Sequence, residues 1–446
     1  MKHLITRTLT GALAGIATYL LPVIAVADVD IQEITTEAGF QAWLVEEPTI
    51  PFVSLELRFE GGASLDPEGK RGVTNLMVGL LEEGSGDLDA RGFAQAQEAL
   101  AASFGYDVSD DSISVSARFL TENQTEAMAL LRESLINPRF DQDAIDRVRA
   151  QVISSIRSDA TDPDTIARET ASAKLYGDHP YATMIDGTED SVTALTRDDL
   201  IAAHKGTIAK DRIYIGAAGD ITAEELSKLI DALLADLPET GLPLPQDVDI
   251  TTTAGITVVP FDVPQSVALF GHRGIPRDDP DFFPAFVLNH AFGGGGFESR
   301  LMTEVREKRG LTYGIYSYIL NKRHADLMMG RVASSNDRIA EAIDVIKAEW
   351  AEVAENGISE EALEEAKTYL TGAYPLRFDS NAAIADIMVG MQFMGLTPEY
   401  ITSRNDRVDA VTMDDIKRVA KRLLLTDELH FVVVGQPEGL ESTPSQ

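Results

Sequence analysis

The chain has 446 residues, of which 44% are hydrophobic and 25% are charged, a composition typical of a globular protein with more than one domain. Its 72 acidic and 38 basic residues give a formal net charge of −34, which disfavours binding to nucleic acid and to anionic lipid. It has no cysteine, which excludes disulfides, cysteine–zinc sites and thiol catalysis.

The N-terminal segment has the pattern of a secretory signal. A basic start is followed by an apolar stretch, and Ala25-Val26-Ala27 supplies small residues at the spacing that signal peptidase requires. We predict that residues 1–27 are a signal peptide, so that the mature chain is periplasmic or secreted. A membrane anchor is the weaker alternative because the apolar stretch is short. No later segment is long and apolar enough to predict a membrane span in the mature chain.

The first part of the mature chain mixes strand and helix patterns. Apolar and polar residues alternate over 53–59 and over 113–119, which predicts two strands that each bury one face. Helical stretches are predicted at 91–103 and 141–158. This mixture favours an α+β fold, in which a mainly antiparallel sheet has helices packed on one face.

A linker divides the chain into two halves. An amphipathic helix begins at Thr222 and is stopped by Pro238, and a polar segment rich in Gly and Pro then precedes a predicted strand near Ile256. We predict one domain over 28–240 and a second over 250–446.

The two halves contain similar segments at one constant offset. Residues 194–200 match 410–416, and 214–219 match 430–435, so the second copy lies 216 residues after the first in both cases. In each copy a Thr-x-x-Asp sequence opens a predicted helix as a variant of the capping box, and a short apolar strand ending in Gly follows. The sequence therefore predicts two tandem domains of similar fold.

Common catalytic motifs are missing from the sequence. No two of the seven histidines lie within four residues of each other, so neither H-E-x-x-H nor H-x-x-E-H is present. There is no G-x-S-x-G elbow. The run Gly293-Gly294-Gly295-Gly296 is not followed by Lys-Ser/Thr, so it is not a phosphate-binding loop. We interpret His179 as a turn residue packed by its neighbours.

Two segments resemble the M16 (pitrilysin/insulinase-type) peptidase family. The first is 59–64 followed by 72–84, which in active members forms a strand, a glycine-rich turn and a helix carrying H-x-x-E-H. The two histidines bind zinc and the glutamate acts as the base for the attacking water. The second segment, 293–301 continuing through 304–314, is similar to the second-domain motif, in which an Arg and a Tyr seven residues apart help to bind substrate.

By this resemblance the zinc site has lost its chemistry. The first histidine, the glutamate and the second histidine fall on Asn75, Val78 and Gly79 in that order, and the third zinc ligand, a glutamate in active members, falls on or next to Ser155. None of these four residues is a good zinc ligand or a proton-transfer group. We therefore expect a degenerate zinc site, with no metal or other cofactor bound by this chain.

The arginine–tyrosine motif is retained as Arg306 and Tyr313. Gly310 is predicted to end a helix containing Arg306, and 311–320 is predicted to be a strand, so that the two side chains face a common space across a tight turn. Alternatively, Arg306 is one more charge in Arg-Glu-Lys-Arg, and Tyr313 is a half-buried strand aromatic. The glycine run 293–296 is interpreted either as a loop that a peptide can approach closely or as a flexible loop.

The resemblance implies a non-catalytic, substrate-binding subunit of a heteromeric zinc endopeptidase. Zinc would be held by a homologous partner with an intact H-x-x-E-H, and the substrate would be a peptide or an unfolded polypeptide. The alternative is an inactive peptide-binding or scaffold protein with an M16 fold and no peptidase partner. A third hypothesis, an independent hydrolase, lacks a visible nucleophile–base pair.

Overall fold

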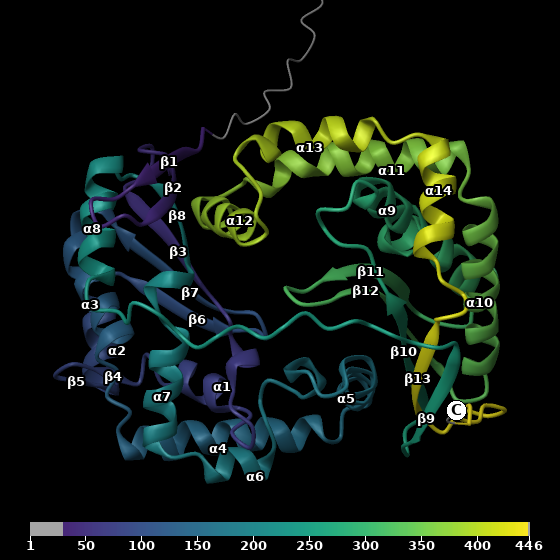
Figure 1. Cartoon of the computed structure of the whole chain (residues 1–446), viewed down its shortest axis with the longest axis horizontal. Coiled ribbons are helices and arrows are strands. Elements are labelled where there is room, and N and C mark those ends of the chain that lie inside the picture. The colour runs from purple at the N-terminus through teal and green to yellow at the C-terminus, as the bar shows by residue number, and fades with distance from the viewer. Residues whose placement is uncertain (1–29, 445–446) are drawn as a thin grey trace, which may run out of the picture.

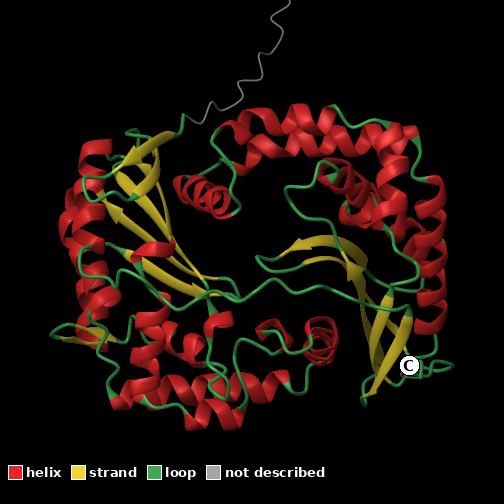
Figure 2. Ribbon diagram, viewed as in Figure 1, coloured by secondary structure: helices red, strands yellow, loops and turns green. Residues whose placement is uncertain are grey.

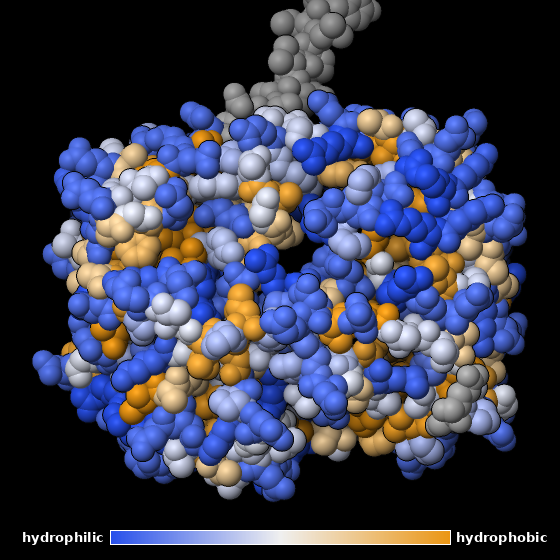
Figure 3. All heavy atoms as spheres, in the orientation of Figure 1, coloured by the Kyte–Doolittle hydropathy of each residue, from blue (hydrophilic) through white to orange (hydrophobic). Residues whose placement is uncertain are grey.

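A computed structural model describes residues 30–444, so the predicted signal peptide lies outside the described residues. The chain forms two sheet-and-helix units that lie side by side (Figure 1). Most helices cover the outer faces of the two sheets, and the linker crosses between the units (Figure 2). The viewed surface is mostly hydrophilic and is hollowed near its centre (Figure 3). In the part of the chain described, no helix combines the length and the apolar character needed to cross a membrane.

The first sheet has six strands in the order β1-β2-β8-β3-β7-β6. Their bounds are β1 Gln32–Thr35, β2 Gln41–Glu46, β3 Phe52–Glu60, β6 Ser103–Val108, β7 Ser112–Leu120 and β8 Ile213–Gly219. β3 and β7 are the two strands predicted from alternation, and they pair antiparallel with Leu55 opposite Ala117. Only the β2–β8 pairing of this sheet is parallel. A separate small hairpin joins β4 Gly84–Ser85 and β5 Leu88–Asp89.

The second sheet has five strands in the order β11-β12-β10-β13-β9. Their bounds are β9 Gly255–Pro260, β10 Gln265–Arg273, β11 Ile315–Asn321, β12 Asp326–Ser335 and β13 His430–Gly435. The β9–β13 pairing is parallel and the other three are antiparallel. β9 is the strand that was predicted near Ile256.

The sequence repeat corresponds to a repeat of topology. β8 and β13 hold equivalent places, because each pairs antiparallel with one neighbour and parallel with the other. The helices before them, α7 Arg197–Thr207 and α14 Met413–Leu423, both begin with a capping box, formed by Thr196 and Thr412. The predicted duplication of a mainly antiparallel α+β fold is therefore confirmed.

The other helices of the first half are α1 Val73–Val78, α2 Ala90–Ala99, α3 Gln124–Ile136, α4 Gln142–Asp159, α5 Pro163–Tyr176, α6 Glu189–Ala194 and α8 Ala223–Leu234. α4 lies where a helix was predicted over 141–158. The helix predicted over 91–103 was too long, since Ala101 takes a positive φ of 49° and β6 begins at Ser103.

The other helices of the second half are α9 Phe282–Asn289, α10 Ile339–Asn356, α11 Glu360–Ala373, α12 Asn381–Phe393 and α13 Glu399–Asp409. Each half has its own large apolar core. In the second core Trp350 is fully buried, and its ring contacts Phe270 and Phe292 edge-on. Its Nε1 donates a hydrogen bond to Nε2 of His272, at 3.1 Å.

The two halves exchange one helix each. α12 packs on the first sheet, where Ala385 and Met388 meet Trp43 and Ala218. α5 packs on the second sheet, where its alanines meet the valines of β13. Each sheet thus has helices of its own half on one face, as predicted, and a helix of the other half on the opposite face. Figure 1 shows both exchanged helices between the sheets.

The turn between β11 and β12 adds polar contacts between the halves. Lys322 lies 2.5 Å from the carboxylate of Asp110, and Arg323 lies 2.6 Å from that of Glu60. The backbone N–H of Arg323 also donates to the side chain of Asp111, at 3.0 Å. These contacts and the exchanged helices fix how the two halves sit together.

Candidate functional site

Asn75, the first of the degenerate zinc positions, serves a structural contact. It lies on α1, and its amide donates a hydrogen bond to Oδ1 of Asp186, at 2.8 Å. Burial raises the pKa of the Asp186 carboxyl, and the nearby charge of Asp159 raises it further. The amide of Asn75 therefore stabilises a carboxylate that is partly removed from water, in the loop that covers the start of α1.

The other three degenerate positions offer no ligand set. Val78 is buried in the first core, and Gly79 is the C-cap residue that follows α1. A Cβ placed on Gly79 would lie 3.3 Å from Cγ1 of Val148 on α4, so any side chain here would crowd Val148. Ser155 is exposed on α4. Within residues 30–444, no three His, Cys, Asp or Glu side chains are grouped closely enough to hold a metal ion. These residues do not fit zinc.

Arg306 and Tyr313 line one cavity of about 580 Å³. Its wall also includes Gln265 and Ser334 from the second sheet and Arg338 before α10. The prediction that the two side chains face a common space is therefore confirmed.

The predicted strand start at Leu311 was wrong, because β11 begins four residues later. The hydroxyl of Thr312 accepts a hydrogen bond from the N–H of Gly314 and donates to the carbonyl of Ala333, at 3.0 and 2.6 Å. A side chain thus occupies the backbone groups that a strand ladder would use. As a result Tyr313 projects from a turn and is 87% exposed. The alternative interpretation of Tyr313 as a half-buried strand aromatic is therefore wrong.

Arg306 is the next-to-last residue of a short π-helical segment, Met302–Glu307. Gly310 follows with a φ of 60°, and its N–H donates to the carbonyl of Arg306, at 2.7 Å. The sequence predicted this glycine-terminated helix end. The guanidinium carbon of Arg306 lies 4.7 Å from the ring centroid of Phe297, which follows the glycine run.

Arg306 differs from the other cations of its segment. Lys308 and Arg309 both pair with Glu304, at 2.6 and 2.8 Å. Burial of Glu304 would raise its pKa, but hydrogen bonds from these two cations outweigh it and lower the pKa. In residues 30–444 no carboxylate forms an ion pair with Arg306. Its charge is therefore available to a ligand in the cavity.

The glycine run is a packed turn at its start and open at its end. The π-helical turn His290–Gly294 places Gly293 against β11, where a Cβ would lie 2.2 Å from Oγ of Ser317. Gly296 has a φ of 62° and no other atom within 4 Å of the Cβ position. Only this end leaves room for another chain to approach. The nearby β11 is an edge strand, paired with β12 alone.

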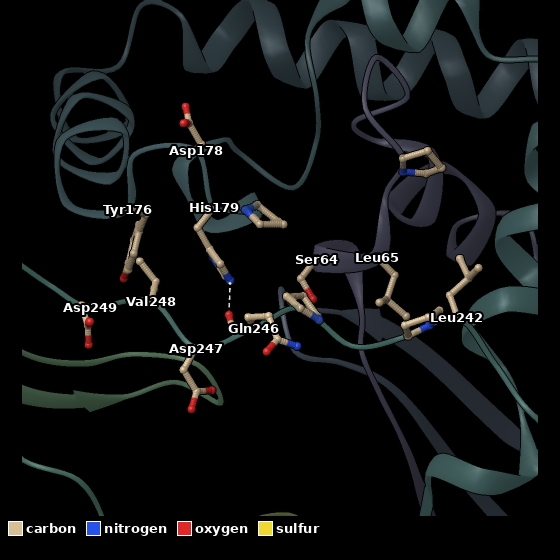
Figure 4. Close-up of a pocket in the computed structure, with 14 residues that line it drawn as sticks. Ser64, Leu65, Tyr176, Asp178, His179, Leu242, Gln246, Asp247, Val248 and Asp249 are labelled. Atoms are coloured by element: carbon tan, nitrogen blue, oxygen red, sulfur yellow. Dashed lines mark hydrogen bonds between the residues drawn. The ribbon is translucent and has the colours of Figure 1, made fainter.

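A second cavity, of about 840 Å³, lies between His179 and the linker (Figure 4). Nδ1 of His179 accepts from the N–H of Tyr181, at 3.2 Å, and Nε2 donates to the carbonyl of Gln246, at 3.1 Å. Burial lowers the pKa of the imidazole, so the ring is neutral at pH 7. Both nitrogens are used by the backbone, which confirms His179 as a packed turn residue.

Two family models match this chain. One, described as insulinase (peptidase family M16), matches residues 42–189, and the other, described as the peptidase M16 inactive domain, matches 194–370. The chain belongs to peptidase family M16. The non-peptidase homologue YmxG of Helicobacter pylori is 25% identical to it over 87% of this chain and 90% of its own length. An uncharacterised zinc protease of Mycobacterium leprae is 27% identical to this chain over 79% of this chain and 80% of its own length.

Solved M16-like structures agree with this architecture. The peptidase M16 inactive domain from Pseudomonas fluorescens superposes with a TM-score of 0.86 at 29% identity, covering 94% of this chain and all of that one. A protease from H. pylori superposes with a TM-score of 0.82 at 16% identity, covering 91% and 99%, and shows the shared fold alone.

This M16 chain should retain no stoichiometric zinc after dialysis. The reason is that, by the family resemblance, Asn75, Val78, Gly79 and a residue on or next to Ser155 fall where active members have zinc ligands and a base. Elemental analysis of the purified mature chain measures this. One tightly held zinc ion per chain would contradict the expectation.

Proposed function

We propose that this chain is the exported, non-catalytic, substrate-binding subunit of a heteromeric zinc endopeptidase. In this proposal Arg306 and Tyr313 complete the zinc site of a homologous partner that carries an intact H-x-x-E-H. The observation that carries the proposal is the cavity that Arg306, which has no ion-pair partner among residues 30–444, shares with the exposed Tyr313. The same chain has no residues suited to bind zinc at its own degenerate positions.

The chemistry of the two residues suits peptide hydrolysis. A tetrahedral intermediate places negative charge on the former carbonyl oxygen, and the hydroxyl of Tyr313 can donate a hydrogen bond to it. The planar fork of Arg306 can hold the peptide backbone or neutralise charge. The open glycine end and the edge strand β11 lie on the same half, so an extended peptide could add to that edge.

A peptide-binding scaffold without a peptidase partner is the second candidate. Loss of the zinc site fits both functions equally. The exposed Tyr313 beside an unpaired Arg306 favours the first, because a pure scaffold would not need a hydrogen-bond donor and a cation at this spacing. The printed name of the H. pylori relative, a non-peptidase homologue, is compatible with either candidate.

Arg306→Ala should lower kcat/KM of the reconstituted complex by about tenfold to a hundredfold, the range expected for losing a charge-assisted hydrogen bond. We expect KM to rise and kcat to fall. Arg306→Lys should recover little, because an ammonium lacks the planar fork. Steady-state kinetics on a peptide substrate measures this. Lys308→Ala is the matched control, since Lys308 is exposed and already paired with Glu304. Equal kcat/KM for Arg306→Ala and for the control would refute the proposed role of Arg306 in peptide hydrolysis.

A further inference from the structure

A pocket rich in arginine is lined by residues of α9, α12 and α13 and by Arg58 of the first sheet. Arg58 comes from β3, Arg277 from the segment before α9, Arg377 from the turn after α11, and Arg404 from α13. The pocket has a single carboxylate, Asp386, which lies 3.1 Å from the guanidinium of Arg58. The Nε of Arg58 is buried and has no hydrogen-bond partner. The pocket is therefore strongly basic in a very acidic chain.

Three of these arginines carry charge that no carboxylate offsets. Within residues 30–444, Arg277, Arg377 and Arg404 form no ion pair. Arg404 is only 6% exposed, and its Nη1 donates to the carbonyl of Leu370 and to the side-chain oxygen of Asn405, at 2.6 and 2.8 Å. Burial lowers the pKa of this guanidinium. A buried charge without a counter-charge is costly, and an anion in the pocket would offset that cost.

Aromatic rings fix how the guanidinium groups are presented. The guanidinium carbon of Arg277 lies 4.2 Å from the ring centroid of Phe282, and its Nη2 donates to the hydroxyl of Tyr400, at 2.6 Å. The guanidinium carbon of Arg404 lies 4.5 Å from the ring centroid of Tyr374. Packing against a ring covers the flat face of a guanidinium and leaves in-plane N–H groups for an oxyanion. The arrangement is pre-organised for a carboxylate.

The size of the pocket restricts what can enter. Its volume is about 210 Å³, below the range of roughly 300–1,000 Å³ that is usual for whole small-molecule ligands. An end group can enter while the rest of the ligand stays outside. Phe283, Met391 and Met394 form an apolar wall beside the arginines. We infer that the pocket binds the terminal carboxylate of a peptide, with the last side chain against this wall, an assignment that rests on the proposed peptide-binding function.

The test is calorimetric titration of the mature chain alone with three probes. These are a short peptide ending in leucine, the same peptide amidated at its C-terminus, and inorganic phosphate. The free acid should bind at least about tenfold more tightly than the amide, since one charge-assisted contact is lost on amidation. Equal affinity of the two peptides would overturn the inference. Binding of phosphate without binding of the acid peptide would also overturn it, and would mark a free-anion site instead.

Substitutions of the pocket arginines test where the peptide binds. Arg377→Gln and Arg277→Gln should each remove most of the preference for the acid, and thermal melts check that both variants fold. Arg91→Gln, on the exposed surface of α2, is the matched control and should keep the preference. A preference that survives in both pocket variants would place the peptide elsewhere and overturn the inference. That failure would leave the kinetic role of Arg306 untouched.

Discussion

Tyr313→Phe should lower the turnover of the reconstituted peptidase by about a hundredfold to a thousandfold, the usual loss when one oxyanion donor is removed. The substitution deletes one hydroxyl from a side chain that is 87% exposed, so the fold and the assembly should not change. The loss should lie in kcat, since the hydrogen bond strengthens only as charge develops on the oxygen. Steady-state kinetics at saturating peptide measures it.

Tyr316→Phe is the matched control for this substitution. Tyr316 lies on β11, three residues further along the chain, and is 44% exposed. It does not line the cavity that contains Tyr313. Turnover of the control should stay within about twofold of the wild-type value, which is far less than the loss predicted for removing one oxyanion donor. Near wild-type turnover of Tyr313→Phe would show that its hydroxyl takes no part in hydrolysis.

Trp350→Ala should destabilise the second half by about 3–5 kcal/mol, the range for truncating a large core aromatic. Trp350 is fully buried against Phe270 and Phe292. The substitution also removes the donor to Nε2 of His272. Burial lowers the pKa of His272 to about 4, so at neutral pH the ring is uncharged and its Nε2 needs that donor. Urea denaturation followed by circular dichroism measures the change in free energy of unfolding.

Trp350→Phe separates packing from hydrogen bonding. It keeps an aromatic ring but leaves Nε2 of His272 unsatisfied, which should cost about 1–3 kcal/mol. Both variants retain Trp43 as their only tryptophan. Because Trp43 packs against α12, its fluorescence reports when the second half leaves the first sheet. A loss below about 1 kcal/mol in Trp350→Ala would contradict this description of the core.

Much of the fold could be predicted because its signals are local. Alternation revealed β3 and β7, and one constant offset revealed the duplicated topology. The exchange of α5 and α12 could not be predicted. An apolar residue such as Met388 shows that a helix face will be buried, but not which of two similar sheets will cover it. That choice depends on contacts between residues far apart in the chain.

The candidate site was also predicted in part from local sequence signals. The spacing of Arg306 and Tyr313 indicated that they share a space, and the structure places them on one cavity. Which cation of the Arg-Glu-Lys-Arg run stays unpaired depends on side-chain reach toward Glu304. The exposure of Tyr313 depends on the turn made by Thr312. The arginine pocket could not be predicted either, because the two halves contribute its residues separately.

The proposed heteromeric peptidase is tested most directly by peptide cleavage with three samples: the mature chain, a homologous zinc-bearing chain with an intact H-x-x-E-H, and their mixture. We expect no cleavage by this chain alone and little by the zinc-bearing chain alone. The mixture should cleave the peptide, and the two chains should elute together on size-exclusion chromatography at micromolar concentration. A mixture no more active than the zinc-bearing chain, or two chains that elute independently, would contradict it.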